Sequence, residues 1–160
     1  MRGGWRLWGI VIVLPVLHFL LHVGLGASRW SPDLLTVALL VGARELRTGT
    51  AAGLGFVFGI LEDAFSVLAF GANALAMTVL GILGARSREV FVGDSLLFLI
   101  SYLALGKWFR DLLHWLVSSP EVRGALMDDL VVDGAVGAGY AAVVGAFVVL
   151  VVGVWREPVA

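Results

Sequence analysis

The sequence predicts an all-α membrane protein whose six transmembrane helices form one polytopic domain over residues 1–160. Three observations predict this fold class. Of the 160 residues, 60% are hydrophobic and the mean hydropathy is +0.99, whereas soluble domains are about 45–50% apolar. Six apolar runs follow one another, separated by short segments with charges, glycine or proline. Arginines gather in alternate gaps between these runs, as expected when successive helices cross a membrane in opposite directions.

The composition excludes several classes of protein. The formal net charge is −1, so the chain lacks the positive field typical of nucleic-acid binding. It has no cysteine, which excludes disulfides and thiolate metal sites. The first apolar run, from Leu7 to Leu25, is longer than the ~7–15 residues of a signal-peptide core, and further runs follow it. We therefore expect this run to be retained as the first span.

The spans are placed by hydropathy and by helix-start signals. The second begins at Ser31-Pro32-Asp33, which supplies an N-cap, a proline in the first turn and an acid at the positive helix end. The second and fourth spans are shorter than the ~20 residues that a bilayer requires, so they must tilt little, thin the bilayer or be shielded by neighbours. The predicted spans are about 6–26, 32–43, 50–69, 72–86, 91–117 and 131–154.

The arginines predict the orientation, because Lys and Arg are enriched in cytoplasmic loops. In a six-span topology, only Arg29 and Arg123 fall on one side of the membrane. Seven others share the opposite side: Arg2, Arg6, Arg44, Arg47, Arg86, Arg88 and Arg156. We therefore expect both termini to be cytoplasmic. Four of these arginines form an inner basic rim that either touches anionic lipid headgroups or cytoplasmic partners, or only determines the topology: Arg44, Arg47, Arg86 and Arg88.

Charges occur inside two predicted spans, although one charge at bilayer depth costs roughly 2.5–3.5 kcal/mol. Glu62 and Asp63 lie about 18–20 Å from the cytoplasmic end of the third span. The fifth span carries four polar residues at i, i+3, i+4 and i+7, on one helix face: Lys107, Arg110, Asp111 and His114. The depths of the two groups overlap, so we expect an intramembrane ion-pair cluster. In it Glu62 and Asp63 pair with Lys107 and Arg110, and Asp111 is a further partner.

This predicted cluster has three interpretations that the sequence does not separate. The charges fix the relative position of two spans, answer a residue on another membrane protein, or form a proton or ion path. His18 and His22 lie one helical turn apart, a spacing that can chelate a metal. No third ligand accompanies them, so we expect packing near the outer boundary rather than a metal or other cofactor. No nucleophile-and-base arrangement stands out, and no enzymatic activity is expected.

Rows of small residues at four-residue spacing let helix backbones approach closely. Gly55 and Gly59 form such a row in the third span, and Ala138, Ala142 and Ala146 form one in the sixth. Each row either packs within the monomer or provides a groove for a span of another protein. The sequence leaves both possibilities open.

Several motifs together resemble the rod shape-determining protein MreD family. They are S-P-D-L-L-T-V-A-L-L at 31–40, G-A-R-E-L-R-T-G at 42–49, G-F-V-F-G-I-L-E-D-A-F-S at 55–66, F-G-A-N-A-L-A at 70–76 and G-I-L-G-A-R at 81–86. The resemblance covers about half of the chain in motifs and all of it in the number and size of spans. Pro32, Asp33 and Asp63 match positions of the family pattern, whereas Glu62 replaces an apolar residue.

The resemblance implies a non-enzymatic scaffold of the bacterial cell-elongation machinery, which makes peptidoglycan and determines rod shape. It implies an inner-membrane location and partners: the single-span protein MreC, and further RodA, a class B penicillin-binding protein and MreB. On this basis we expect MreC to bind through transmembrane helix packing. Asp63, paired with Lys107 or Arg110, would be a structural or partner-site anchor.

The six-span layout also resembles the substrate-binding components of energy-coupling-factor vitamin transporters, and this is the alternative function. Such components usually carry an A-x-x-x-A row in the first span, and the first span here lacks it. Transport would further require an outward-facing polar cavity of about 300 Å³ or more. The missing row favours the scaffold.

Overall fold

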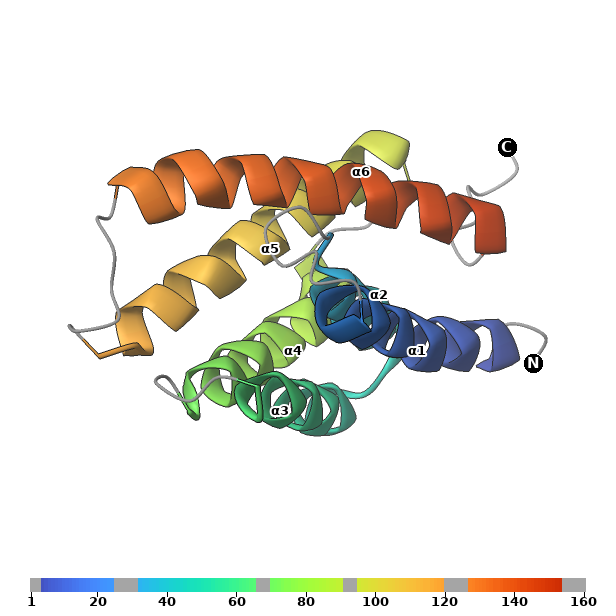
Figure 1. The fold of residues 1–160 in the computed structure, drawn as a ribbon. Helices are drawn as coiled ribbons and strands as arrows, with labels where there is room; N and C mark the ends of the chain where they lie inside the picture. The colour runs from blue at the N-terminus through green and yellow to red at the C-terminus, as the bar shows by residue number, and fades with distance from the viewer. Residues whose placement is uncertain (1–3, 25–31, 66–69, 91–94, 120–126, 154–160) are drawn as a thin grey trace.

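Six α-helices are present in the computed structural model, which describes residues 4–24, 32–65, 70–90, 95–119 and 127–153 (Figure 1). They are α1 (Gly4–Phe19), α2 (Leu34–Glu45), α3 (Thr48–Asp63), α4 (Ala72–Val90), α5 (Leu96–Val117) and α6 (Gly134–Val152). A π-helical segment, Leu20–Gly24, continues α1, and another, Met127–Asp133, leads into α6. The described residues contain no strand, so the all-α prediction is confirmed.

The short helix α2 is the centre of the bundle. Every residue from Leu34 to Ala43 is buried, and all five other helices contact α2. At 12 residues and ~1.5 Å per residue, α2 is about 18 Å long, well below the thickness of a bilayer core. The other helices enclose it, so shielding by neighbours, one of the three possibilities left open for this short segment, is present.

Several helix ends differ from the predicted spans. α3 ends at Asp63 rather than near residue 69, and residues 66–69 lie outside the described part. α5 begins at Leu96 rather than at 91, because Ser95 caps it by accepting a hydrogen bond from the backbone N–H of Phe98 (3.2 Å). α4 continues to Val90, past the predicted end at 86. Charged residues there end the apolar run without ending the helix.

Two helical segments of the described chain are long and apolar enough to cross a membrane, Trp5–His22 and Leu130–Val152. α2 and α3 are 12 and 16 residues long, and α4 and α5 include charged residues. Length and hydropathy therefore do not identify these four helices as spans. The six-span topology stays a prediction.

The predicted rows of small residues are buried inside the bundle. A Cβ on Gly55 would overlap the backbone carbonyl of Met77, and a Cβ on Gly59 would overlap the backbone of Ala74, so α3 and α4 pack with their backbones in contact. The alanine row of α6 is also buried: Ala138, Ala142 and Ala146. Both rows pack within the monomer, and neither leaves an open groove at these positions.

Candidate functional site

Polar side chains from four helices meet inside the bundle, where α2 begins, α3 ends, α4 begins and the second half of α5 passes. They are joined by hydrogen bonds and ion pairs rather than scattered along the helices. We name this group the polar cluster; its members are Asp33, Glu62, Asn73, Lys107, Arg110 and Asp111.

The guanidinium of Arg110 is the centre of the polar cluster. Its Nη2 lies 2.5 Å from Oε1 of Glu62 and donates a hydrogen bond of 2.6 Å to Oδ1 of Asn73. Its Nη1 lies 3.4 Å from Oδ2 of Asp33 and 3.3 Å from Oδ1 of Asp111. Guanidinium is planar, permanently charged and rich in donors, which suits it to several acceptors at once. Arg110 therefore connects α5 to α2, α3 and α4.

Lys107 adds a second, partly buried cation one helical turn earlier on α5. Its Nζ lies 2.5 Å from Oδ1 of Asp111, in an i, i+4 pair, and 3.6 Å from Oδ2 of Asp33. The two cations thus face three carboxylates, those of Asp33, Glu62 and Asp111. Buried charges persist in proteins when they are paired in this way, because pairing offsets the cost of removing them from water.

Asp33 has two structural functions at once. It caps α2 by accepting hydrogen bonds from the backbone N–H of Thr36 (2.9 Å) and from the Thr36 hydroxyl (2.7 Å). The same carboxylate faces Lys107 and Arg110. The sequence predicted Ser31 as the cap, a residue outside the described part of the chain. The observed cap joins the first turn of the central helix to the cations of α5.

Asp63 is buried, with 1% of its surface exposed, but it does not belong to the polar cluster. Its carboxylate accepts hydrogen bonds from three backbone N–H groups: those of Gly71 (2.9 Å), Asn73 (3.1 Å) and Ala74 (2.9 Å). These groups lie at the start of α4, where helix N–H donors have no intrahelical acceptor. Asp63 thus fastens the end of α3 to the start of α4.

The predicted pairing of Asp63 with Lys107 or Arg110 is therefore corrected. Among the described residues Glu62, not Asp63, makes the ion pair with α5. At 3.6 residues per turn, adjacent side chains on a helix point about 100° apart. Glu62 and Asp63 consequently face different neighbours, the first α5 and the second α4.

Two members of the polar cluster were not predicted as such from the sequence. Asp33 was assigned only to the start of a helix and to the family pattern, and Asn73 appeared only within a motif of the family resemblance. Asn73 is 5% exposed and lies in the first turn of α4. A lone amide at the first turn of an apolar span is a usable signal, because a buried amide requires a polar partner.

His18 on α1 and His22 on the π-helical segment that continues it lie close to this region. His18 is 3% exposed, and its ring stacks on that of His22 with centroids 4.4 Å apart. His18 also lies within electrostatic range of Asp33 and Glu62. The described residues contain no group of three or more His, Cys, Asp or Glu side chains placed to hold a metal ion.

The polar cluster is nearly closed as a network. Within the described part of the chain, Oε2 of Glu62 and Nε of Arg110 are buried atoms without a hydrogen-bond partner. The other polar atoms of the cluster contact residues of this chain, either on a neighbouring helix or on the same helix. Chemically, this arrangement holds helices in register, and it leaves one acceptor and one donor free.

Comparison with known proteins identifies the family. A family model described as rod shape-determining protein MreD matches residues 2–116. This region exceeds half of the chain and contains the whole polar cluster, and the chain belongs to the MreD family. No curated protein matches, and no solved structure matches. The chain is thus a membrane protein with a role in rod shape determination.

Proposed function

We propose that this MreD-family chain is a non-enzymatic scaffold that crosses the bacterial inner membrane six times and binds MreC laterally. Family membership supports the role in rod shape and peptidoglycan synthesis. The observation that carries the scaffold is the inverted distribution of polarity, with charges inside and large apolar side chains outside. RodA, a class B penicillin-binding protein and MreB would be further partners of the same assembly.

The outer surface of the bundle is apolar where a soluble protein would be polar. Leu97 is 75% exposed, Phe147 67% and Val16 63%. Arg110, in contrast, is 8% exposed and Asp63 1%. Exposed large apolar side chains over several helices mark a surface for lipid or protein rather than for water. This pattern supports a bundle that lipid surrounds along α1, α5 and α6.

The arginines support an orientation with both termini in the cytoplasm. Arg44 lies in the last turn of α2 and Arg47 at the cap of α3. On α4, Arg86 and Arg88 are exposed, and Nη1 of Arg88 donates a hydrogen bond of 3.4 Å to the carbonyl of Arg44. We name this end of the bundle, opposite the polar cluster along α2, the inner end. Arg2, Arg29, Arg123 and Arg156 lie outside the described residues.

A stripe along α6 is the surface that we assign to the MreC span. Its large side chains are exposed and recur at spacings of four and three residues: Val136, Tyr140, Val143, Phe147 and Leu150. A seam with this spacing is typical of left-handed packing between two helices. The small-residue rows are already used within the chain, so the partner would pack against these larger side chains instead.

Co-purification with MreC tests the scaffold. We expect tagged chain in detergent to retain MreC in a stoichiometric complex. A cysteine at Phe147 should crosslink to a cysteine in the MreC span, and a cysteine at Phe56, exposed on α3, should not. The chain has no cysteine of its own, so each single-cysteine variant reports one position. Recovery without MreC, or with a bound vitamin and an ATPase module, would reject the scaffold in favour of the transporter alternative.

Labelling of the same cysteine-free chain tests the topology. A cysteine at Phe70, exposed at the start of α4, should react with an impermeant maleimide in intact spheroplasts. A cysteine at Arg47 should react only after the membrane is permeabilised. The opposite pattern would reverse the proposed orientation.

A further inference from the structure

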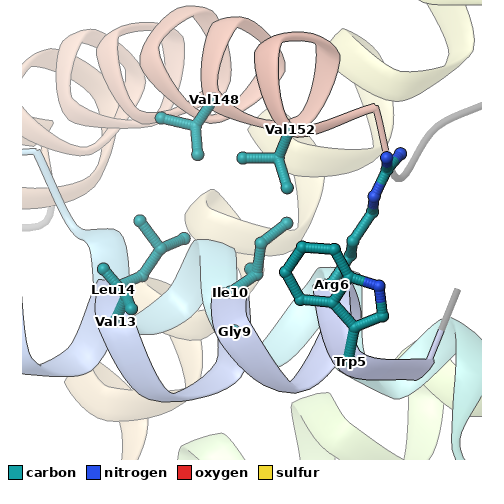
Figure 2. A pocket seen from close by; sticks show the side chains of 8 residues that line it. All are labelled: Trp5, Arg6, Gly9, Ile10, Val13, Leu14, Val148 and Val152. Carbon is teal, nitrogen blue, oxygen red and sulfur yellow. The ribbon is translucent and has the colours of Figure 1, made fainter.

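An apolar cleft lies between the N-terminal half of α1 and the C-terminal end of α6 (Figure 2). Its volume is about 410 Å³, within the ~300–1,000 Å³ of ligand-binding pockets. Six residues of α1 and two of α6 line it: Trp5, Arg6, Gly9, Ile10, Val13, Leu14, Val148 and Val152. Apart from the Arg6 guanidinium and the Trp5 indole N–H, these side chains are apolar.

Gly9 helps to keep this cleft open. A Cβ built on Gly9 meets no atom within 4 Å, so this glycine is not needed for close contact between helix backbones. Both α1 and α6 pack on the central helix α2, and the cleft lies between them. A side chain at position 9 would enter the space between the two helices. A glycine in a helix interior costs roughly 0.5–1 kcal/mol relative to alanine, and at position 9 it leaves the cleft unfilled.

The mouth of the cleft carries a positive charge. Arg6 extends from α1 toward the C-terminal end of α6, where a Cβ on Gly153 would lie 3.4 Å from its Nη1 (Figure 2). Its Cζ lies 5.7 Å from the Trp5 ring centroid, and no carboxylate among the described residues pairs with it. Trp5 is 73% exposed, as a tryptophan at a membrane interface is.

We propose that this cleft binds an anionic phospholipid of the inner leaflet, with an acyl chain between α1 and α6 and the headgroup phosphate on Arg6. The wall of Ile10, Val13, Leu14 and Val148 matches a hydrocarbon chain. The guanidinium at the mouth matches a phosphate, as basic pockets between transmembrane helices do on the cytoplasmic side. This inference rests on the proposed function only for the leaflet, which follows from the cytoplasmic N-terminus.

The size of the cleft favours a lipid chain over a helix of a partner. One turn of α-helix, about 10 Å across and 5.4 Å high, already occupies roughly 420 Å³. A cleft of 410 Å³ therefore holds no more than a single turn. A hydrocarbon chain is thinner and fits a space whose α1 wall runs from Trp5 to Leu14. The stripe on α6 that we assign to MreC lies on a different set of residues.

Lipid titration of the purified full chain tests the proposal. Delipidated protein in detergent is titrated with palmitoyl-oleoyl phosphatidylglycerol or the matching phosphatidylcholine, with bound lipid counted by native mass spectrometry. We expect saturable binding of one phosphatidylglycerol per chain. Gly9→Phe should abolish it by filling the cleft. The matched control is Gly53→Phe, because Gly53 is also the sixth residue of its helix, is exposed, and likewise has no atom within 4 Å of a built Cβ.

Arg6→Gln tests the headgroup independently of the cleft volume. We expect the preference for phosphatidylglycerol over phosphatidylcholine to fall about fivefold, the effect of one basic residue at an anionic surface. Arg86→Gln, at an exposed arginine of the inner end, should leave that preference unchanged. Equal binding by Gly9→Phe and Gly53→Phe, or an unchanged preference in Arg6→Gln, would overturn the proposal.

The outcomes separate this inference from the scaffold. Loss of MreC from Gly9→Phe with phosphatidylglycerol binding intact would assign the cleft to the partner and overturn the lipid site. Saturable lipid binding by a chain that never retains MreC would support the lipid site while rejecting the scaffold. Labelling of a cysteine at Arg6 in intact spheroplasts would reject the inner leaflet as the source of the lipid.

Discussion

Arg110 on α5 and Glu62 at the end of α3 form a partly buried ion pair, with Nη2 of the arginine 2.5 Å from Oε1 of the glutamate. The residues are far apart in the sequence, and the helices that carry them both surround α2. The same guanidinium also contacts Asp33 and Asn73. A bundle whose outside is apolar obtains little specificity from burial alone, since lipid is as apolar as its side chains. Paired charges supply that specificity.

Removal of Arg110 should destabilise the fold strongly. Arg110→Leu leaves the partly exposed carboxylate of Glu62 without a cation; breaking a fully buried pair costs about 3–5 kcal/mol, which is the upper bound for this pair. The double variant Glu62→Leu with Arg110→Leu should be more stable than Arg110→Leu alone, because neither charge then stays unpaired. Thermal unfolding in detergent measures both. Arg86→Leu, at an exposed arginine, is the control and should shift the midpoint little. A double variant no better than Arg110→Leu would contradict this pairing.

Asp63→Leu should lower stability without removing an ion pair. The change leaves the N–H groups of Gly71, Asn73 and Ala74 without their acceptor, and each unsatisfied buried donor costs about 1–3 kcal/mol. Asp63→Asn keeps one acceptor oxygen and should cost less. The measurement is the unfolding midpoint together with hydrogen exchange at the start of α4. Equal loss in both variants would mean that the negative charge, and not the cap, is what α4 requires.

Asp33→Ala should loosen α2 and α5 together. The variant removes the cap on Thr36, worth about 0.5–2 kcal/mol, and the carboxylate that faces Lys107 and Arg110. Asp33→Asn should keep the cap and lose only the charge. Hydrogen exchange should therefore rise at the first turn of α2 in Asp33→Ala and stay low there in Asp33→Asn. Protection of that turn in both variants would contradict the assigned cap.

The helical period predicted part of this site and could not predict the rest. The positions of Glu62 along the third span and of Arg110 along the fifth predicted that the two residues lie at similar depth in the membrane. That prediction needs only the rise per residue of a helix. Which of two adjacent carboxylates faces α5 depends on the rotation of α3, and that is determined by the contact of Gly55 with the α4 backbone. Asp33 was not predicted as a member of the polar cluster, because in the sequence it is an ordinary helix-start signal. Only the fold brings the cations of α5 beside it.

The two glycines Gly55 and Gly53 should respond in opposite directions to the same change. Gly55→Ala places a Cβ against the Met77 carbonyl, so α3 and α4 must separate and stability should fall. Gly53→Ala meets no atom within 4 Å and removes a glycine from a helix interior, which stabilises by about 0.5–1 kcal/mol. Unfolding midpoints of the two variants in one detergent test this. A rise in both would show that α3 and α4 do not depend on backbone contact at Gly55.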